Sequence, residues 1–246
     1  MPSLGRTLAL IYGVVAYVVF LGTFLYSIGF VGNIVVSKSI DDGPQKPFGQ
    51  ALLTNLILLG LFGLQHSAMA RQEFKKWWTQ IIPQPVERST YVLIASLLLL
   101  LLFWQWRAMP GVVWEVDDPA GQRILEALFW IGWLVALYST FLIDHFDLFG
   151  LRQVTLYARG KEYTPPRFKM PELYQYVRHP IMMGFLIAFW ATPVMTVGHL
   201  LLAIATTAYI LIGIRLEERD LMDLYGQAYR EYRRRVSMII PLPRKK

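Results

Sequence analysis

The sequence of 246 residues contains no cysteine, and only 17% of its residues are charged. The absence of cysteine excludes disulfides, thiolate metal ligands and a cysteine nucleophile, so any thiol chemistry requires a thiol brought by a substrate. Soluble domains carry about 25% charged and 45–50% apolar residues, whereas 55% of these residues are hydrophobic. The balance excludes disordered, fibrous and small disulfide-rich proteins and indicates an integral membrane protein.

Charged side chains are missing altogether from five long stretches of the chain. These stretches are residues 7–37, 47–70, 89–106, 127–143 and 179–214. A helix needs about 20 mostly apolar residues to cross the bilayer core. We therefore expect an all-α, polytopic bundle of membrane helices. The first four spanning helices are expected over about 8–36, 49–70, 89–106 and 124–143.

The last uncharged stretch is too long to cross the membrane once. As one helix, residues 179–214 would extend about 54 Å, against a hydrocarbon core of about 30 Å. Pro193 and Gly198 lie near its middle, where a turn would divide it. The sequence therefore predicts a hairpin of helices over about 180–192 and 200–214, the second continuing into solvent and followed by a C-terminal helix. The total is about five to six crossings.

The basic residues are distributed unevenly between the two sides of this arrangement. With six crossings, 20 of the 24 Lys and Arg residues fall on the side that carries both termini, and 4 fall on the other side. Cytoplasmic loops carry the excess of Lys and Arg in membrane proteins. We therefore expect both termini in the cytoplasm. The net charge of +7 is explained by contact with the bilayer, and we expect no nucleic-acid partner.

Polar residues gather at the start of the predicted hairpin. Tyr176, Arg178 and His179 directly precede Pro180, a residue that suits the first turn of a helix. A helix N-terminus has free N–H groups and a positive field, so this position favours a carboxylate ligand. The alternative is that Arg178 only anchors the helix among lipid headgroups.

Carboxylates and tyrosines follow the second helix of the hairpin. Glu217 and Glu218 lie just beyond the apolar segment, and Tyr225, Tyr229 and Tyr232 recur on one helical face. Carboxylates beside aromatic rings can bind a cationic or ribose-bearing ligand. The alternative is an interfacial amphipathic helix with internal ion pairs. Because both polar groups flank one hairpin, we expect them to lie close together.

These motifs resemble a known superfamily. Tyr174, Arg178, His179, Pro180 and Gly184 meet the pattern Tyr-x-x-x-Arg-His-Pro-x-x-x-Gly. With the hairpin, Glu217-Glu218 and Tyr229, the pattern is similar to the isoprenylcysteine carboxyl methyltransferase superfamily. That resemblance implies a membrane enzyme that uses S-adenosylmethionine.

Motifs elsewhere narrow the resemblance to the NnrU-related branch of this superfamily. Two segments carry it: Gly63-Leu-Gln65-His66-Ser67-Ala-Met69-Ala-Arg71 with Trp77-Trp78, and Glu87-Arg88-Ser89-Thr90-Tyr91. Two further segments, Asp144–Gln153 and Thr164–Phe168, resemble the bacterial methanethiol S-methyltransferases. The resemblance spans nearly the whole chain. Because no internal repeat, low-complexity tract or long flexible linker divides the sequence, we expect a single domain, 1–246, with N-terminal helices over 1–143 and a cofactor-binding part over 144–246. The resemblance further implies methylation of methanethiol, a small volatile thiol, to dimethyl sulfide at the bacterial inner membrane.

The resemblance and the position of polar groups near the cytoplasmic face give two sets of candidate residues. A thiol is mostly protonated near neutral pH, so the enzyme must remove its proton or stabilise the anion. The catalytic candidates are His66, Asp144, His145, Asp147 and Arg178. The candidates for binding S-adenosylmethionine are Tyr176, Arg178, His179, Glu217, Glu218, Tyr225 and Tyr229.

Several alternatives stay open from the sequence. Asp144-His145-x-Asp147 could hold a metal ion, but a second spaced ligand pair is missing, and an ion-pair cluster is the preferred interpretation. His66 could instead hydrogen-bond a neighbouring helix. The methyl acceptor could be another thiol, a lipid or an isoprenylated carboxylate. The chain could also be a non-catalytic NnrU-like membrane protein. We expect no metal and no protein partner.

Overall fold

The computed structural model describes residues 3–165 and 169–241 and divides into two compact units. The first unit comprises Met1–Pro110 and Asp144–Pro166, and the second comprises Gly111–Ile143 and Arg167–Lys246. The units therefore interleave in the sequence. One limit between the units falls after residue 143, as in the expected division, but each unit contains residues from both sides of it. The expectation of a single domain stays a prediction.

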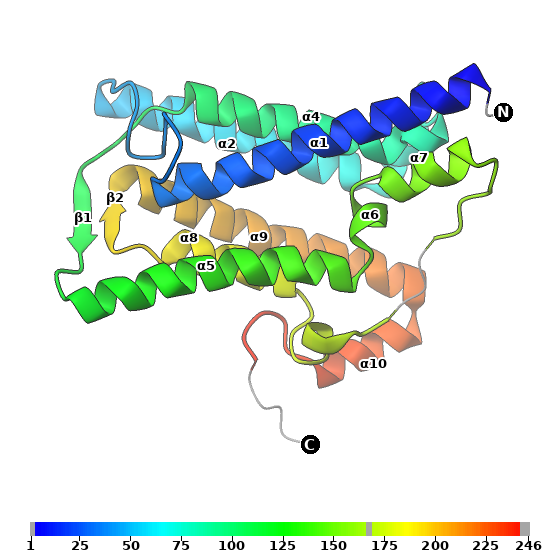
Figure 1. The fold of residues 1–246 in the computed structure, drawn as a ribbon. Coiled ribbons are helices and arrows are strands. Elements are labelled where there is room, and N and C mark those ends of the chain that lie inside the picture. Colours follow the sequence, from blue (N-terminus) through cyan, green and yellow to red (C-terminus); the bar gives the residue numbers. More distant parts are fainter. Residues whose placement is uncertain (1–2, 166–168, 242–246) are drawn as a thin grey trace. The chain divides into compact units, whose positions relative to one another are not determined.

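The first unit is a bundle of long apolar helices with short helices at one end. Over the described residues its helices are α1 (Leu4–Gly32), α2 (Phe48–Ala70), α3 (Gln72–Trp78), α4 (Gln84–Gln105), α6 (His145–Leu148) and α7 (Leu151–Ala158). Helix α4 packs against both α1 and α2, and α7 packs against α1 and α4 (Figure 1). The aromatic rings of Phe30, Phe103 and Trp106 fill the contact between α1 and the end of α4.

A glycine joins α6 to α7 against the start of α4. Gly150 has a φ of 88°, in the left-handed region that glycine adopts without a Cβ penalty. A Cβ at this position would lie 2.7 Å from the backbone nitrogen of Ser89. The chain can therefore approach α4 this closely only with glycine, and this contact fixes the segment that carries Asp144, His145 and Asp147.

The second unit is built around a helical hairpin. Its described elements are β1 (Val112–Glu115), α5 (Pro119–Leu142), the 3₁₀ helix η1 (Glu172–Gln175), α8 (Pro180–Trp190), β2 (Val194–Thr196), α9 (Val197–Tyr225) and α10 (Gln227–Arg235). Helix α5 packs along α8, and α8 along α9 (Figure 1). Asp118 caps α5 by accepting from Gly121 N, and Thr196 caps α9 by accepting from His199 N.

Two short strands set the direction of the hairpin. Strand β1 pairs antiparallel with β2, with Val112 opposite Thr196 and a register shift before Trp114. The turn between α8 and α9 therefore lies beside the start of α5. At the opposite end, the Tyr174 hydroxyl donates to the carbonyl oxygen of Ser139. Helix α8 thus runs antiparallel to α5, and its first residues lie near the end of α5.

Small residues let α5 and α8 pack backbone against backbone. A Cβ on Gly132 would lie 2.5 Å from Ala188 N, and one on Gly184 would lie 2.5 Å from Ala136 N. Gly132 and Ala136 are four residues apart, as are Gly184 and Ala188. Small residues at this spacing bring membrane helices into close van der Waals contact.

Substitution of Gly184 by leucine should separate these two helices. The added side chain would meet backbone atoms of α5, which cannot move aside as a flexible side chain could. We expect a loss of about 3 kcal/mol in the free energy of unfolding, the upper range for overpacking, measured by denaturant titration in micelles. Gly213→Leu is the matched control, because a Cβ at Gly213 on α9 meets no heavy atom within 4 Å among the described residues. Equal stability of the two variants would contradict the argument.

The expected fold class is confirmed. Within the described residues, α1, α2, α4, α5 and α9 are long and apolar enough to cross a membrane. The hairpin is also confirmed, but α8 has only 11 residues, about 16 Å of helix against a core of about 30 Å. By length, the described residues therefore support five full crossings. The sequence predicts a loop over 107–123 and a turn over 193–199, so it does not indicate the two strands.

Candidate active site

A buried ion pair joins the two ends of the hairpin in the second unit. Arg178 precedes α8, and its Nε donates to Glu218 Oε1 of α9 at 2.6 Å. Both side chains are nearly inaccessible, with exposed fractions of 4% for Arg178 and 6% for Glu218. A charge removed from water needs a partner to offset its desolvation, so each of these residues depends on the other.

The chain after α10 returns to the same place and binds Arg178. The guanidinium Nη1 donates to the carbonyl oxygens of Arg233 and Val236, at 3.1 and 2.5 Å. The backbone N–H groups of Arg178 and His179 donate to the carbonyls of Ser237 and Met238. The C-terminal segment is thus fixed to the start of α8 by both side-chain and backbone hydrogen bonds.

His179 contacts both carboxylates of the Glu-Glu pair. Its Nε2 lies 3.2 Å from Glu218 Oε1, and its Nδ1 lies 3.6 Å from Glu217 Oε2. The side chain of Glu217 is 46% exposed, whereas that of Glu218 is 6% exposed. Glu217 can therefore reach a ligand from solvent, while Glu218 serves the interior of the cluster.

A basic hollow of about 590 Å³ adjoins this cluster. It is lined by Arg178, Met222, Arg230, Arg233 and Arg234. Arg233 also reaches the second oxygen of Glu218, with Nε to Oε2 at 3.1 Å. Guanidinium groups form charge-assisted hydrogen bonds with carboxylates and phosphates. The hollow is therefore chemically suited to the anionic end of a ligand.

Buried tyrosines lie beside the cluster. Tyr229 and Tyr232 are buried, and the Tyr232 hydroxyl donates to the carbonyl oxygen of Tyr174 at 2.6 Å. Burial raises the pKa of Tyr232 to about 12, and it raises the pKa values of Tyr174 and Tyr229 as well. These phenols are therefore neutral at physiological pH and do not act as bases.

The two remaining tyrosine candidates are more accessible. Tyr225 is half-buried beside the pair formed by Tyr229 and Tyr232, whereas Tyr176 is 69% exposed. The structure thus groups Arg178, His179, Glu217 and Glu218 directly around one another. Tyr225 and Tyr229 lie in the adjoining aromatic cluster, and Tyr176 lies at the surface.

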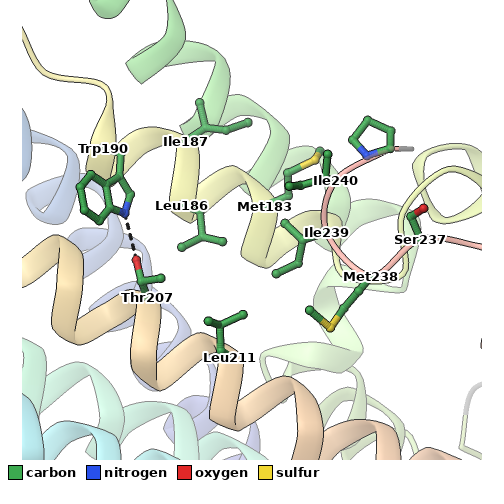
Figure 2. Close-up of a pocket in the computed structure, with 11 residues that line it drawn as sticks. Met183, Leu186, Ile187, Trp190, Thr207, Leu211, Ser237, Met238, Ile239 and Ile240 are labelled. Carbon is green, nitrogen blue, oxygen red and sulfur yellow. Dashed lines mark hydrogen bonds between the residues drawn. The ribbon is translucent and has the colours of Figure 1, made fainter. Parts of the chain in front are cut away.

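An apolar groove runs along the hairpin from this cluster. Its volume is about 1100 Å³, and its lining residues are Met183, Leu186, Ile187, Trp190, Thr207, Leu211, Ser237, Met238, Ile239, Ile240 and Pro241. Figure 2 shows the side chains of α8, α9 and the C-terminal segment converging on this space. Met183 lies one helical turn after His179, so the groove begins beside the charged cluster and is suited to an apolar chain.

The first unit contains His66, the candidate base. His66 lies near the end of α2, half-buried, with its ring stacked on Phe62 at 5.3 Å. The Tyr91 hydroxyl lies 3.0 Å from the imidazole nitrogens. Arg88 lies over the ring of Tyr91 at 4.9 Å and donates to the carbonyl oxygen of Leu148. His66 is therefore oriented by a tyrosine that the sequence interpretation had left without a role.

The Asp144-His145-x-Asp147 segment forms polar contacts within the first unit. His145 is buried, which lowers its pKa and keeps it neutral, and its Nε2 lies 2.8 Å from the Tyr17 hydroxyl. Asp147 pairs with Arg152 at 2.9 Å and accepts from Tyr163. Asp144 precedes α6 with a φ of 80°. The Asp147–Arg152 contact supports the ion-pair interpretation. Over the described residues, no group of three or more His, Cys, Asp or Glu could hold a metal ion.

The structure adds residues that the sequence interpretation missed. Tyr91 contacts His66, and Arg233 contacts Glu218. Tyr91 belongs to the motif Glu87–Tyr91, and that position in a motif is a signal by which a functional role could be predicted. Arg233 is one of three consecutive arginines, and no local pattern distinguishes it from the other two. Of the recognised motif Thr164–Phe168, Pro166, Arg167 and Phe168 lie outside the described residues.

Comparisons with known proteins agree with these motifs. Residues 54–239 match the family described as NnrU protein. The Methanethiol S-methyltransferase of Mycobacterium tuberculosis is 58% identical over 238 residues, which cover 97% of this chain and 98% of the relative. Methanethiol S-methyltransferase 1 of Bradyrhizobium diazoefficiens is 59% identical, covering 96% of this chain and 83% of the relative. The Methanethiol S-methyltransferase of Crocosphaera subtropica is 55% identical, covering 99% and 95%. No solved structure matches the chain.

Proposed function

The chain belongs to the NnrU family, and from this premise we propose that it is an enzyme that methylates methanethiol to dimethyl sulfide with S-adenosylmethionine. The observation that carries the proposal is the 58% identity to a relative named Methanethiol S-methyltransferase over 97% of this chain. The absence of cysteine is compatible with it, because the reacting sulfur belongs to the substrate.

The second unit offers groups that fit S-adenosylmethionine. The basic hollow beside Arg178 suits the carboxylate of the cofactor. The half-exposed Glu217 suits its ammonium group or ribose hydroxyls, and Tyr225 and Tyr176 offer ring faces to the adenine. Glu218 and His179 contribute by holding Arg178 and Glu217 in place. Bound S-adenosylmethionine supplies a methyl group on a positively charged sulfur.

The first unit offers a group that fits the thiol proton. In the proposed reaction the S–H bond of methanethiol breaks, its proton passes to the imidazole of His66, and the thiolate sulfur forms a bond to the methyl carbon as the carbon–sulfonium bond breaks. The products are dimethyl sulfide and S-adenosylhomocysteine. Tyr91 supports this step because it fixes the ring orientation of His66. Asp144, His145 and Asp147 are proposed to shape the same region rather than to take the proton, since His145 and Asp147 are engaged with Tyr17 and Arg152.

The membrane orientation is also part of the proposal. The chain is an integral membrane protein with five helices of spanning length among the described residues. We place it in the inner membrane with both termini in the cytoplasm, an arrangement in which α8 and the turn after it return the chain to the far side before α9 crosses. With that return, 20 of its 24 Lys and Arg residues lie on the cytoplasmic side. The charged cofactor would reach the protein from that side, whereas methanethiol is apolar enough to arrive through the bilayer.

The direct test is product formation by the purified protein. In detergent or nanodiscs, with methanethiol and S-adenosylmethionine, we expect dimethyl sulfide detected by gas chromatography in equal amount to S-adenosylhomocysteine. Calorimetric titration with S-adenosylhomocysteine gives the control for intact protein and separates an enzyme from a non-catalytic membrane protein. Protein that binds S-adenosylhomocysteine but forms no dimethyl sulfide would refute the proposed acceptor.

The apolar groove favours a second candidate acceptor. Its volume of about 1100 Å³ is far larger than methanethiol requires and would take the chain of a lipid or an isoprenylated carboxylate. Incubation of the protein with methyl-labelled S-adenosylmethionine, methanethiol and membrane lipids together distinguishes the two. Label recovered in the lipid fraction would support this candidate, and label recovered only as volatile dimethyl sulfide would exclude it.

A further inference from the structure

Three polar atoms in the interior of the first unit have no hydrogen-bond partner among the described residues, and Gln153 Oε1 on α7 is one of them. The other two are the side-chain oxygen Oε1 of Gln65 and the indole nitrogen Nε1 of Trp78. A buried polar atom without a partner costs free energy, and such atoms are rare in folded proteins. Gln65 Oε1 is an acceptor and Trp78 Nε1 is a donor.

Both atoms belong to the surroundings of His66. Gln65 directly precedes His66 on α2, and its Nε2 donates to the sulfur of Met69 at 3.0 Å. Met69 and Tyr91 belong to one buried cluster, and Trp78 of α3 packs against that cluster. Tyr91 is the residue whose hydroxyl contacts the His66 imidazole. Gln65, Trp78 and His66 thus all contact the same buried cluster, Gln65 through Met69 and His66 through Tyr91.

The unpaired atoms of Gln65 and Trp78 match the hydrogen-bonding capacity of a thiol. A thiol group is a weak S–H donor and a weak sulfur acceptor. On binding, its S–H can donate to Gln65 Oε1 while its sulfur accepts from Trp78 Nε1. Rotation about the C–S bond then turns the S–H toward His66, which takes the proton. A sulfur that loses its proton becomes a stronger acceptor, so the Trp78 N–H also stabilises a thiolate. The apolar remainder of the cluster suits a methyl or short alkyl group.

We propose that Gln65 and Trp78 form the binding site for the thiol group of the acceptor, next to His66. The proposal rests on the proposed methyltransferase function and assigns the acceptor to residues on α2 and α3. The site selects small thiols over alcohols, because a sulfur atom forms longer hydrogen bonds and fits an apolar, sulfur-containing surrounding such as Met69.

Trp78→Phe removes the N–H donor and keeps an aromatic ring at this position. We expect a 5- to 10-fold higher KM for methanethiol, about the effect of losing one hydrogen bond, while the KM for S-adenosylmethionine stays the same. Trp77→Phe is the matched control, because the neighbouring Trp77 is 52% exposed and should leave both constants unchanged. Gln65→Met, which removes the acceptor and keeps the length, should raise the same KM. An unchanged KM for methanethiol in both Trp78→Phe and Gln65→Met would overturn the proposal.

A binding measurement separates this proposal from the proposed function. In ¹⁵N-labelled protein saturated with S-adenosylhomocysteine, which cannot donate a methyl group, the Trp78 indole N–H signal is identified by its loss in Trp78→Phe. Methanethiol should shift this signal, and methanol should not. A parent protein that forms dimethyl sulfide without any shift of this signal would refute the thiol site alone. A parent protein that forms no dimethyl sulfide would refute the function itself.

Discussion

Replacing His66 by alanine is expected to lower the maximal rate of methanethiol methylation at neutral pH by about 10²-fold or more, the usual scale for a lost general base. A thiol near neutral pH is mostly protonated, and the thiolate is the nucleophile. Without the imidazole, the proton has to leave by a slower route. Initial rates of dimethyl sulfide formation at saturating substrates give the measurement.

The pH dependence separates a base from a residue that only maintains packing. Raising the pH supplies thiolate from solution, so the His66→Ala variant should recover part of its rate as the pH approaches the pKa of methanethiol. That pKa lies above the value of about 8.5 for cysteine, because methanethiol lacks the electron-withdrawing backbone groups. The affinity for S-adenosylhomocysteine should stay the same, because His66 is proposed to take the thiol proton and not to bind the cofactor. Ser67→Ala, one residue along α2, is the control and should keep the parent rate and profile. An unchanged rate in His66→Ala would remove His66 from the mechanism.

The membrane helices could be predicted because the bilayer imposes their length and polarity. A segment such as 49–70 has no charge and matches α2 (Phe48–Ala70) closely. Helix α4 begins at Gln84, five residues before its uncharged stretch, because its first turn carries the charged residue Glu87. Absence of charge locates the part of a helix within the bilayer, and it gives no information on turns that extend into water.

The strands and part of the site could not be predicted, since they depend on contacts between distant segments. Strand β1 exists only through its pairing with β2, about 80 residues later in the chain. The proximity of Arg178 to Glu218 followed from the hairpin and is present in the structure. The contact between the C-terminal segment and Arg178 could not be predicted from a sequence motif. It is made through the backbone carbonyls of Arg233 and Val236, and every residue type has such a carbonyl.

Glu218→Ala should produce the largest loss of stability in the second unit. The two oxygens of Glu218 accept from Arg178 and Arg233 and contact His179. Without this carboxylate, the buried Arg178 guanidinium keeps the two carbonyl acceptors of its Nη1 but loses the charged acceptor of its Nε. Breaking a buried ion pair from one side costs about 3–5 kcal/mol. We expect a loss of this size in the free energy of unfolding, measured by denaturant titration in micelles.

Glu217→Ala is the matched control, because it removes the neighbouring carboxylate, which is 46% exposed. Surface ion pairs contribute about 0–1 kcal/mol, so this variant should unfold close to the parent while binding S-adenosylhomocysteine more weakly. Arg178→Lys separates charge from geometry, since lysine keeps the charge but cannot reach Glu218 and two carbonyls with one nitrogen. We expect it to lose both stability and cofactor affinity. Equal stability of Glu218→Ala and Glu217→Ala would show that the buried pair does not hold the hairpin and the C-terminal segment together.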